Sequence, residues 1–489
     1  MRLKIKKLKL EAGRPIVFLH EKTAQKLNIH IGDRIAITQK NLRAIAIFDI
    51  VKSLVSEKEV VLSQEVFEYA KFNSKKEVHI NLALSPESTT YIIKKLNGKS
   101  LSREEIFAVV GDIVDNSLTE AEIAYFVAGV YEKGMSFKEI CFLTEAIYKT
   151  GSKLFWDKKE IADKHSIGGI AGNRTTPIVV SICAAAGITM PKTSSRAITS
   201  AAGTADAMEV LAKVDLSLND LKRVVKKTNA CLTWGGSLGL APADDKLIRV
   251  ERLLNLDPEP QLLASIISKK LAAGSKYILI DIPYGPQAKV SKEKARKLKL
   301  KFLKIAKNFK LHMHVVLTPA DQPIGNGIGP VLEIKDVLRV LQQNNSPKDL
   351  ENKSIFLAAK ILEMMGKSKP GKGEFIARSI LETGVAYDKF KEIIDAQGKI
   401  KADLGLAKHS YEIKAKKSGK ITLIDNKLIN YISRVLGCPE DKKAGIYIHH
   451  HKNEEITEGQ KLLTLYAESS KKLKEAIHFF NESKVIEIN

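Results

Sequence analysis

The segment 276–319 constrains the fold more than any other part of the chain. Two short apolar runs, "KYILIDIPYG" and "LHMHVVLTP", flank the basic amphipathic stretch "SKEKARKLKLKFLKIAKNFK". Apolar runs separated by a helix are typical of buried parallel strands, because parallel neighbours need a long crossover connection. We therefore expect an α/β core. The apolar positions of the helix are spaced for packing onto its sheet: Ala295, Leu298, Phe302, Ile305 and Phe309.

The regions on either side of this core have different residue patterns. Residues 3–82 contain short β-rich runs such as "RPIVFLH" and "RIAITQK", separated by turns. Residues 88–151 have helical patterns throughout, with capping boxes that begin at Ser102 and Thr119. The last 80 residues or so mix strand and helix patterns. The sequence thus predicts separate domains on both sides of the core.

We predict an α/β multidomain protein. The expected domains are a small N-terminal β-rich domain (1–87), a helical domain (88–158, completed by about 243–272), a central α/β phosphate-binding domain (159–409) and a C-terminal α+β domain (410–489).

Composition narrows the function classes. The formal net charge is +23, but the lysines are scattered along the chain, so we expect anionic small substrates and no nucleic-acid partner. Four widely spaced cysteines indicate neither a zinc site nor a disulfide framework. No signal peptide or long apolar run is present, which predicts a cytoplasmic protein without membrane contact. The run His449 to His451 is not expected to bind metal, because successive strand residues point to opposite faces.

The stretch "DKHSIGGIAGNRTTPIVV" has the residue types that an anion site requires. A strand end gives way to a glycine pair, where backbone N–H groups can turn toward an oxyanion. Lys164 adds a charge and Ser166 a donor, and Thr175 and Thr176 stand at the start of the next helix. The alternative is a capped turn that carries a surface lysine.

A second stretch, "PKTSSRAITSAAGTADAMEV", adds a run of hydroxyl groups around Gly203 and ahead of a helix. Arg196 in this stretch either anchors the loop or touches the substrate. Neither stretch contains a Walker lysine motif. The hydroxyl-bearing residues are Ser194, Ser195, Thr199, Ser200 and Thr204.

The third stretch, "LNLDPEPQLLASIISKKLAAG", places Ser265 and Lys269 four residues apart on one helix face. Asp257 precedes that helix, where it is an N-cap or a general acid, and the residues alone favour the cap.

In chain order, "KHSIGG", "SSRAITSAAGT", "PADDK", "SIISKKLAAG" and "DIPYGPQAKV" resemble the motifs of the thymidine phosphorylase family of pentosyltransferases, also called nucleoside phosphorylase II. The resemblance runs from about Ser88 to the C-terminus. The extra N-terminal domain and the form "TSSRAIT" are similar to the long branch, which holds archaeal AMP phosphorylases and bacterial relatives labelled thymidine phosphorylases.

The resemblance implies a role for each matching position. It gives phosphate binding to Lys164, Ser166, Thr176, Ser194 and Thr204. It places His165, Ser265 and Lys269 at the base and makes Asp257 the proton donor, so that Asp257, His165 and Lys269 are the expected catalytic residues. The nucleotide would be lined by Gly169, Ser195, Arg196, Ala197, Ile198, Thr199, Ser200, Thr204, Ser265 and Lys289. A base-binding arginine is expected after "PADDK", where Arg249 and Arg252 are both candidates and the assignment stays open.

The implied reaction is reversible phosphorolysis of an N-glycosidic bond, with inorganic phosphate as substrate and no cofactor or metal. The "GNRTTPIVV" form favours thymidine, and AMP is the alternative. A phosphoribosyltransferase would normally need Mg²⁺, for which no acidic pair is placed. The alternative of another class is a basic RNA-binding protein on a decayed enzyme scaffold. By resemblance, we expect a homodimer or a larger homo-oligomer.

Overall fold

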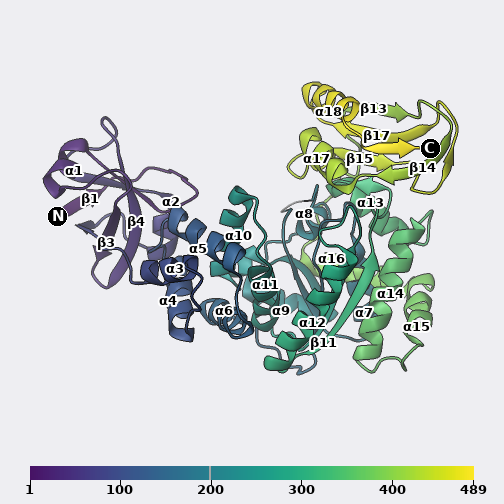
Figure 1. The fold of residues 1–489 in the computed structure, drawn as a ribbon, viewed down its shortest axis with the longest axis horizontal. Helices are drawn as coiled ribbons and strands as arrows, with labels where there is room; N and C mark the ends of the chain where they lie inside the picture. The colour runs from purple at the N-terminus through teal and green to yellow at the C-terminus, as the bar shows by residue number, and fades with distance from the viewer. Residues whose placement is uncertain (198–199) are drawn as a thin grey trace. The chain divides into compact units, whose positions relative to one another are not determined.

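The computed structural model describes residues 1–197 and 200–489 and consists of two compact units. Unit 1 comprises Met1–Gly151 and Ala241–Ser268, and unit 2 comprises Ser152–Leu240 and Lys269–Asn489. Unit 1 contains a β-barrel and a helical bundle, and unit 2 contains an α/β core and a C-terminal α+β region (Figure 1). The predicted fold class is therefore confirmed. No helix in the two described ranges is long and apolar enough to span a bilayer.

The N-terminal part of unit 1 is a closed six-stranded barrel with the strand order β1-β5-β2-β4-β3-β6. Alternate residues point inward, as in β3, where Ile35 and Ile37 are fully buried between partly exposed neighbours. The strands are β1 (Arg2–Ile5), β2 (Ile16–Leu19), β3 (Arg34–Gln39), β4 (Leu42–Ile50), β5 (Glu59–Leu62) and β6 (Glu77–Leu82), with helices α1 (Glu21–Leu27) and α2 (Gln64–Ala70).

The rest of unit 1 is a bundle whose helices begin where the capping patterns predict. Ser102 and Thr119 each accept a hydrogen bond from the backbone of the Glu three residues later, and that Glu accepts one in return. The bundle consists of α3 (Ser88–Leu96), α4 (Arg103–Val114), α5 (Glu120–Lys133), α6 (Phe137–Thr150), α10 (Pro242–Leu254) and the first ten residues of α11 (Glu259–Ala272).

The core of unit 2 is a parallel sheet with the order β11-β10-β7, and β8 and β9 form a second parallel pair. A backbone hydrogen bond from Ala162 to Thr189 connects β7 with the segment that leads into β8. The predicted strand–helix–strand unit is present, and α12 contacts both β10 and β11. The elements are β7 (Ala162–Ser166), β8 (Met190–Ser194), β9 (Ala230–Trp234), β10 (Tyr277–Tyr284), α12 (Lys292–Asn308) and β11 (His312–Pro319).

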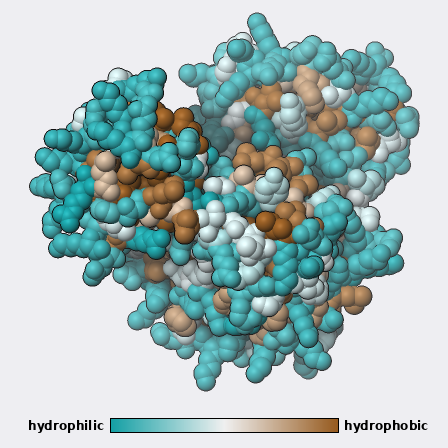
Figure 2. Space-filling view, turned by 60° about the vertical axis from the view of Figure 1, so that its left-hand side comes forward, coloured by the Kyte–Doolittle hydropathy of each residue, from teal (hydrophilic) through white to brown (hydrophobic). Residues whose placement is uncertain are grey.

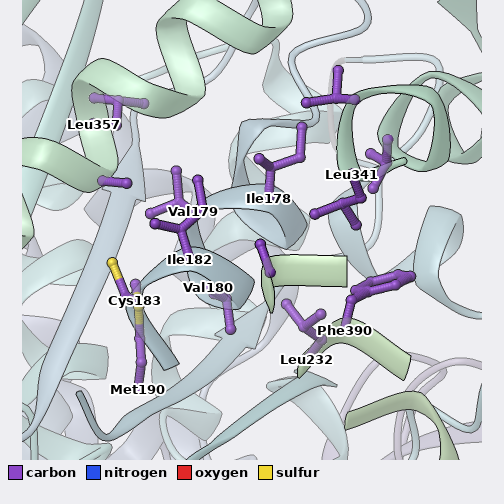
Figure 3. Packing of buried hydrophobic residues seen from close by; sticks show 14 of the residues in the cluster. Ile178, Val179, Val180, Ile182, Cys183, Met190, Leu232, Leu341, Leu357 and Phe390 are labelled. Atoms are coloured by element: carbon purple, nitrogen blue, oxygen red, sulfur yellow. The ribbon is translucent and has the colours of Figure 1, made fainter. Parts of the chain in front are cut away.

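Helix α7 (Thr175–Ala185) lies in the centre of this core and is buried on nearly every side. Figure 3 shows its side chains packed against Leu357, Leu341 and Met190. A helix that is apolar all round needs partners on all sides. The other helices of the core are α8 (Thr204–Met208), α9 (Leu218–Thr228), α13 (Pro330–Leu341), α14 (Lys348–Met364), α15 (Gly373–Glu382) and α16 (Val385–Gln397), with a 3₁₀ turn η1 (Gly236–Leu238).

The C-terminal region has small antiparallel sheets and two helices over a core of its own. That core also contains Ala171 and Ala201 from the α/β part of unit 2. The elements are β12 (Gly327–Ile328), β13 (His409–Lys414), β14 (Gly419–Ile424), α17 (Asn426–Leu436), β15 (Gly445–Ile448), β16 (Glu455–Ile456), β17 (Lys461–Ala467), α18 (Ser470–Glu482) and β18 (Ile486–Ile488).

Hydrophilic residues cover most of the face shown in Figure 2, with scattered apolar areas between them. A chain with 79 Lys and Arg against 56 Asp and Glu is expected to have such a surface.

Candidate functional site

The first glycine-rich loop joins the end of β7 to the start of α7. Strand β7 ends at Ser166, and Gly168 and Gly169 follow with φ of +83° and +90°. These angles are strained for residues with a Cβ, so the glycines allow the backbone to turn there. Helix α7 begins at Thr175, so its positive N-terminal end faces back toward the loop. The strand–turn–helix arrangement predicted for this stretch is present.

Lys164 lies in β7 beneath this loop, with a relative exposure of only 1%. Its ammonium group donates hydrogen bonds to the hydroxyls of Thr175 (2.8 Å) and Thr176 (3.3 Å). Burial lowers the pKa of Lys164 to about 7, although the charge of Asp281 opposes the shift. The surface-lysine alternative is therefore excluded by the structure, and the proposed phosphate role of Lys164 stays a prediction.

Asp281 in β10 is a residue of this site that the sequence analysis missed. It is fully buried and accepts hydrogen bonds from Thr318 (2.6 Å) and from Ser166 (3.1 Å). The ammonium group of Lys353 in α14 lies 3.3 Å from the same carboxylate. The parallel register places Asp281 beside Ser166, and a lone carboxylate inside an apolar strand is the signal that could have identified it.

Buried cations outnumber buried carboxylates around the end of β7. Besides Lys164, the cations are Lys192, Lys270, Lys353 and Arg174, and the carboxylates are Asp163, Asp281 and Glu333. In this set of described residues, five basic side chains lie among three carboxylates, and Lys164 is only partly protonated near pH 7. Burial also lowers the pKa of Lys192 to about 8. A buried excess of positive charge favours an anionic ligand.

The second loop is folded tightly on itself at Gly203. A Cβ at this position would lie 2.4 Å from the backbone carbon of Arg196 and 2.5 Å from the carbonyl oxygen of Ser195. The carboxylate of Asp206 accepts hydrogen bonds from the backbone N–H groups of Ala197 (2.7 Å) and Gly203 (2.8 Å). The loop ends at Thr204, where α8 begins, as predicted.

Arg196 acts as an anchor within this loop. Its guanidinium pairs with Glu209 (2.7 Å) and Asp206 (3.1 Å) and lies 4.9 Å from the ring centre of Trp234. Of the two roles weighed for Arg196, the structure shows the anchoring one, and contact with substrate stays a prediction. The hydroxyl of Ser200 donates to the carbonyl of Ala202 (2.7 Å). Ile198 and Thr199 lie outside the described residues.

Arg174 connects the two loops and was not identified from the sequence. Its guanidinium donates to the Thr204 hydroxyl (3.0 Å) and the Ala202 carbonyl (2.6 Å), and it also pairs with Glu333. Three of the expected phosphate-binding residues are thereby joined in one network, since Arg174 directly precedes the threonines bound by Lys164. Ser194 directs its hydroxyl to the carbonyl of Thr233 (3.1 Å). Arginine beside a predicted anion loop was the signal available in the sequence.

Three further predicted residues, Gly169, Lys289 and His165, lie within unit 2. A Cβ on Gly169 would lie 3.4 Å from the Cβ of Lys289, so this lysine, which is exposed, packs beside the first loop. His165 is half-buried, and burial together with the charges of Lys270, Lys192, Lys164 and Lys269 lowers its pKa well below the usual value. The imidazole is therefore neutral near pH 7 and suited to hydrogen bonding.

The remaining predicted residues belong to unit 1. Ser265 lies on α11 and donates a hydrogen bond to the carboxylate of Asp244 (2.7 Å). Asp257 is exposed and lies two residues before the first residue of α11. Arg249 pairs with Glu120 (3.2 Å) and with the Gly13 carbonyl, while Arg252 is exposed at the end of α10. Which of the two arginines contacts the base stays a prediction.

The structure gives no sign of a metal centre in the residues that it describes, since no three His, Cys, Asp or Glu side chains are grouped there to hold an ion. The histidines of the His449–His451 run follow β15 instead of lying in it, and their ring nitrogens contact Thr464 (2.7 Å), Glu454 (3.0 Å) and Asn326 (2.9 Å). A pocket of about 350 Å³ at the end of β11 is lined by Lys353, Asp321 and Asp349 among others, and by none of the predicted site residues.

Comparison with protein families matches three consecutive parts of the chain. Residues 89–151 match the glycosyl transferase family helical bundle domain, and 158–387 match the glycosyl transferase family a/b domain. Residues 420–487 match the pyrimidine nucleoside phosphorylase C-terminal domain.

Full-length relatives agree with these matches. Proteins named AMP phosphorylase from Pyrococcus furiosus and Pyrococcus abyssi are 45% and 50% identical, and each alignment covers 98% of this chain and 96% of the relative. A putative thymidine phosphorylase from Legionella pneumophila is 39% identical over 93% of this chain and 89% of its own length. The crystal structure of anthranilate phosphoribosyltransferase from Thermus thermophilus, at 16% identity and a TM-score of 0.52, covers 63% of this chain and 98% of its own and shares the fold. With the two loops and the α/β core in place, these matches show that the chain belongs to the thymidine phosphorylase and AMP phosphorylase family and is an enzyme of the pentosyltransferase type.

Proposed function

We propose that this enzyme catalyses the phosphorolysis of AMP, or of a closely related nucleoside 5′-monophosphate, to the free base and ribose 1,5-bisphosphate. The observation that carries the proposal is the near full-length similarity to relatives named AMP phosphorylase, at 43% to 50% identity for those from Pyrococcus and Thermococcus. The sequence motifs alone favoured thymidine. The comparisons favour the nucleotide alternative.

The charge of the site supports the binding of two phosphate groups, one from inorganic phosphate and one from the nucleotide. A nucleotide phosphorylase has to hold inorganic phosphate and the 5′-phosphate at the same time, so it needs more positive charge than a nucleoside phosphorylase. The excess of buried basic side chains around Lys164 would hold the inorganic phosphate. Lys289, packed beside Gly169, would reach the 5′-phosphate together with the hydroxyls of the second loop.

In the proposed reaction, an oxygen of inorganic phosphate attacks C1′ of the ribose while the bond from C1′ to the base nitrogen breaks. Positive charge develops on the ribose and negative charge on the departing base. The phosphate dianion, held by Lys164 and the hydroxyls of Ser166, Thr176 and Thr204, stabilises the ribose charge. Lys269, Arg252 and the neutral His165 would stabilise the base, and Asp257 would supply its proton.

The proposed roles of Asp257, Ser265, Lys269 and Arg252 rest on the family resemblance. Phosphate itself is the nucleophile, so we propose that the reaction needs no metal or organic cofactor. Activity that is retained in the presence of a chelator would support this part of the proposal.

Base release from AMP, CMP, uridine and thymidine, measured side by side with and without phosphate, tests the proposed substrate. We expect phosphate-dependent release of adenine from AMP and little or no thymine from thymidine. Turnover of thymidine without turnover of AMP or CMP would overturn the proposal.

Variants of Lys289 test the origin of nucleotide preference. Lys289→Ala should lower kcat/KM for AMP about tenfold to a hundredfold, because a charge-assisted contact to the 5′-phosphate is lost. Its activity on adenosine should change little. Lys294→Ala is the matched control, since Lys294 is an exposed lysine on the following helix, α12.

A further inference from the structure

One helix of the C-terminal region contacts both loops of the candidate site. The side-chain oxygen of Asn426 in α17 accepts a hydrogen bond from the backbone N–H of Ala171 in the first loop (3.1 Å). The side-chain oxygen of Asn430 accepts one from the backbone N–H of Ala201 in the second loop (2.9 Å). In Figure 1, α17 lies next to α8, the helix that follows the second loop.

The two asparagines are placed one helical turn apart, so their oxygens fix how far apart the two loops lie. Asp425 caps α17 by accepting from the backbone N–H groups of Lys427 (2.8 Å) and Leu428 (2.9 Å), which fixes where the helix begins. The amide of Asn430 also donates to the carbonyl of Asn426 (3.0 Å). The pair is therefore held rigidly within the helix.

These contacts lie in the interior of unit 2. Asn426 and Ala171 are fully buried, and Asn430 and Ala201 are nearly so. The amide nitrogen of Asn426 is buried and has no hydrogen-bond partner in the part of the chain that the structure describes. The side-chain contact of Asn426 that the structure shows is therefore made by its oxygen, which satisfies the buried backbone N–H of Ala171.

A second link joins the C-terminal region to the second loop. Lys442 donates to the carboxylate of Glu209 (2.7 Å), and Glu209 pairs with Arg196 (2.7 Å). The hydrogen bond and ion pair with Arg196, aided by Lys442, lower the pKa of Glu209 to about 2, so this carboxylate stays charged at any pH where the enzyme works. Both links connect the same two parts of unit 2.

We propose that Asn426 and Asn430 are positioning residues for phosphorolysis. By holding the backbone of both loops, they set the distance between the groups that would bind inorganic phosphate and those that would bind the nucleotide. The C-terminal region is then a required part of the active site although it supplies no catalytic residue. This inference rests on the proposed assignment of the two loops to substrate binding.

Variants at Asn426 separate positioning from a merely structural role. Asn426→Leu keeps the side chain's size but removes the acceptor for Ala171, and should weaken phosphate binding and raise the KM for AMP by about tenfold each. Asn426→Asp keeps the acceptor for Ala171 and loses a donor that has no described partner; its buried carboxyl should lower the unfolding temperature, but its KM should stay within about threefold of the parent enzyme. Ser433→Ala is the control, because the hydroxyl of this buried serine bonds only within α17, to Ile429 (2.8 Å), in the described structure.

Phosphate binding is measured by calorimetry with inorganic phosphate alone, and KM and kcat by base release well below the unfolding temperature of each variant. If Asn426→Leu unfolds at a lower temperature but binds phosphate and turns over like the parent, the positioning role is excluded. Asn430→Ala, a milder change, replaces Asn426→Leu if that variant does not fold, and the same two outcomes apply. A parent enzyme that binds no phosphate would overturn the phosphate assignment of the loops, and the positioning role would be overturned along with it.

Discussion

Lys164 shows how burial changes what a single side chain can do. The lysine is enclosed in β7, and its two hydrogen bonds in the described structure go to hydroxyls and not to a carboxylate. With a pKa lowered to about 7 by burial, the group exchanges its proton near neutral pH. A phosphate dianion favours the charged form, so binding of phosphate and protonation of Lys164 should support each other.

We therefore expect the affinity for phosphate to depend on Lys164 and on pH. The ammonium form attracts phosphate, so the KM for phosphate should increase as pH rises through about 7. Lys164→Ala should raise this KM by about tenfold to a hundredfold and should lack that part of the pH profile. Phosphate itself also changes its protonation near this pH. This effect is the same in assays of the parent enzyme and of Lys164→Ala, so only the difference between their pH profiles reports on Lys164. Identical pH profiles of the two proteins would show that Lys164 does not bind the phosphate.

The pair of Asp281 and Lys353 leads to a prediction about stability. Asp281→Asn leaves the buried ammonium of Lys353 without its carboxylate, and should lower the free energy of unfolding by about 3–5 kcal/mol. Adding Lys353→Met to that variant should recover part of the loss, because the unpaired charge is removed. Denaturant unfolding of the two single variants and the double variant measures this coupling. Strictly additive effects would mean that the two groups do not interact.

At the scale of the elements, the second loop depends on a glycine for space and not for its φ. Gly203 has a φ of −87°, which any residue adopts, but a Cβ there would collide with the backbone of Ser195, Arg196 and Ala197. Gly203→Ala should therefore displace the loop and lower kcat/KM by about tenfold or more, since small displacements of binding groups cost about this much.

The control for this variant is Gly111→Ala, in the middle of α4. No heavy atom of another residue lies within 4 Å of the Cβ that would be added there, and alanine favours a helix by about 1 kcal/mol over glycine. Gly111→Ala should raise the unfolding temperature slightly and leave activity unchanged. Full activity of Gly203→Ala in the same assay would show that the loop can move without consequence.

At the scale of the whole molecule, the features that could be predicted from the sequence are those that depend on residues close together in the chain. The strand–helix–strand core, the helix starts at Ser102 and Thr119, and the loop that follows β7 all depend on neighbouring residues, and the structure contains each of them. The family resemblance then supplied the motifs as an ordered set, and the comparisons confirm the family.

What the sequence could not predict are contacts between residues far apart in the chain. Arg174 and Glu333 are 159 residues apart, and Asn426 and Ala171 are 255 residues apart. A buried arginine or asparagine looks the same in a sequence as an exposed one, and only the fold decides which partner it meets. For the same reason, the sequence left two roles open for Arg196, anchoring the loop or touching the substrate. Its ion pairs with Glu209 and Asp206 show the anchoring role.

Unit 1 is built from two separate segments of the chain, Met1–Gly151 and Ala241–Ser268, and this affects the order in which the protein can fold during synthesis. The bundle core needs Ala243, Leu247, Val250 and Ala264, which leave the ribosome after all of α3–α6 and after the first strands of unit 2. At typical translation rates, the apolar face of the first four helices waits on the order of 10 s for these residues. A chaperone that protects this face should therefore bind α3–α6 of the nascent chain while residues 151–241 are being synthesised.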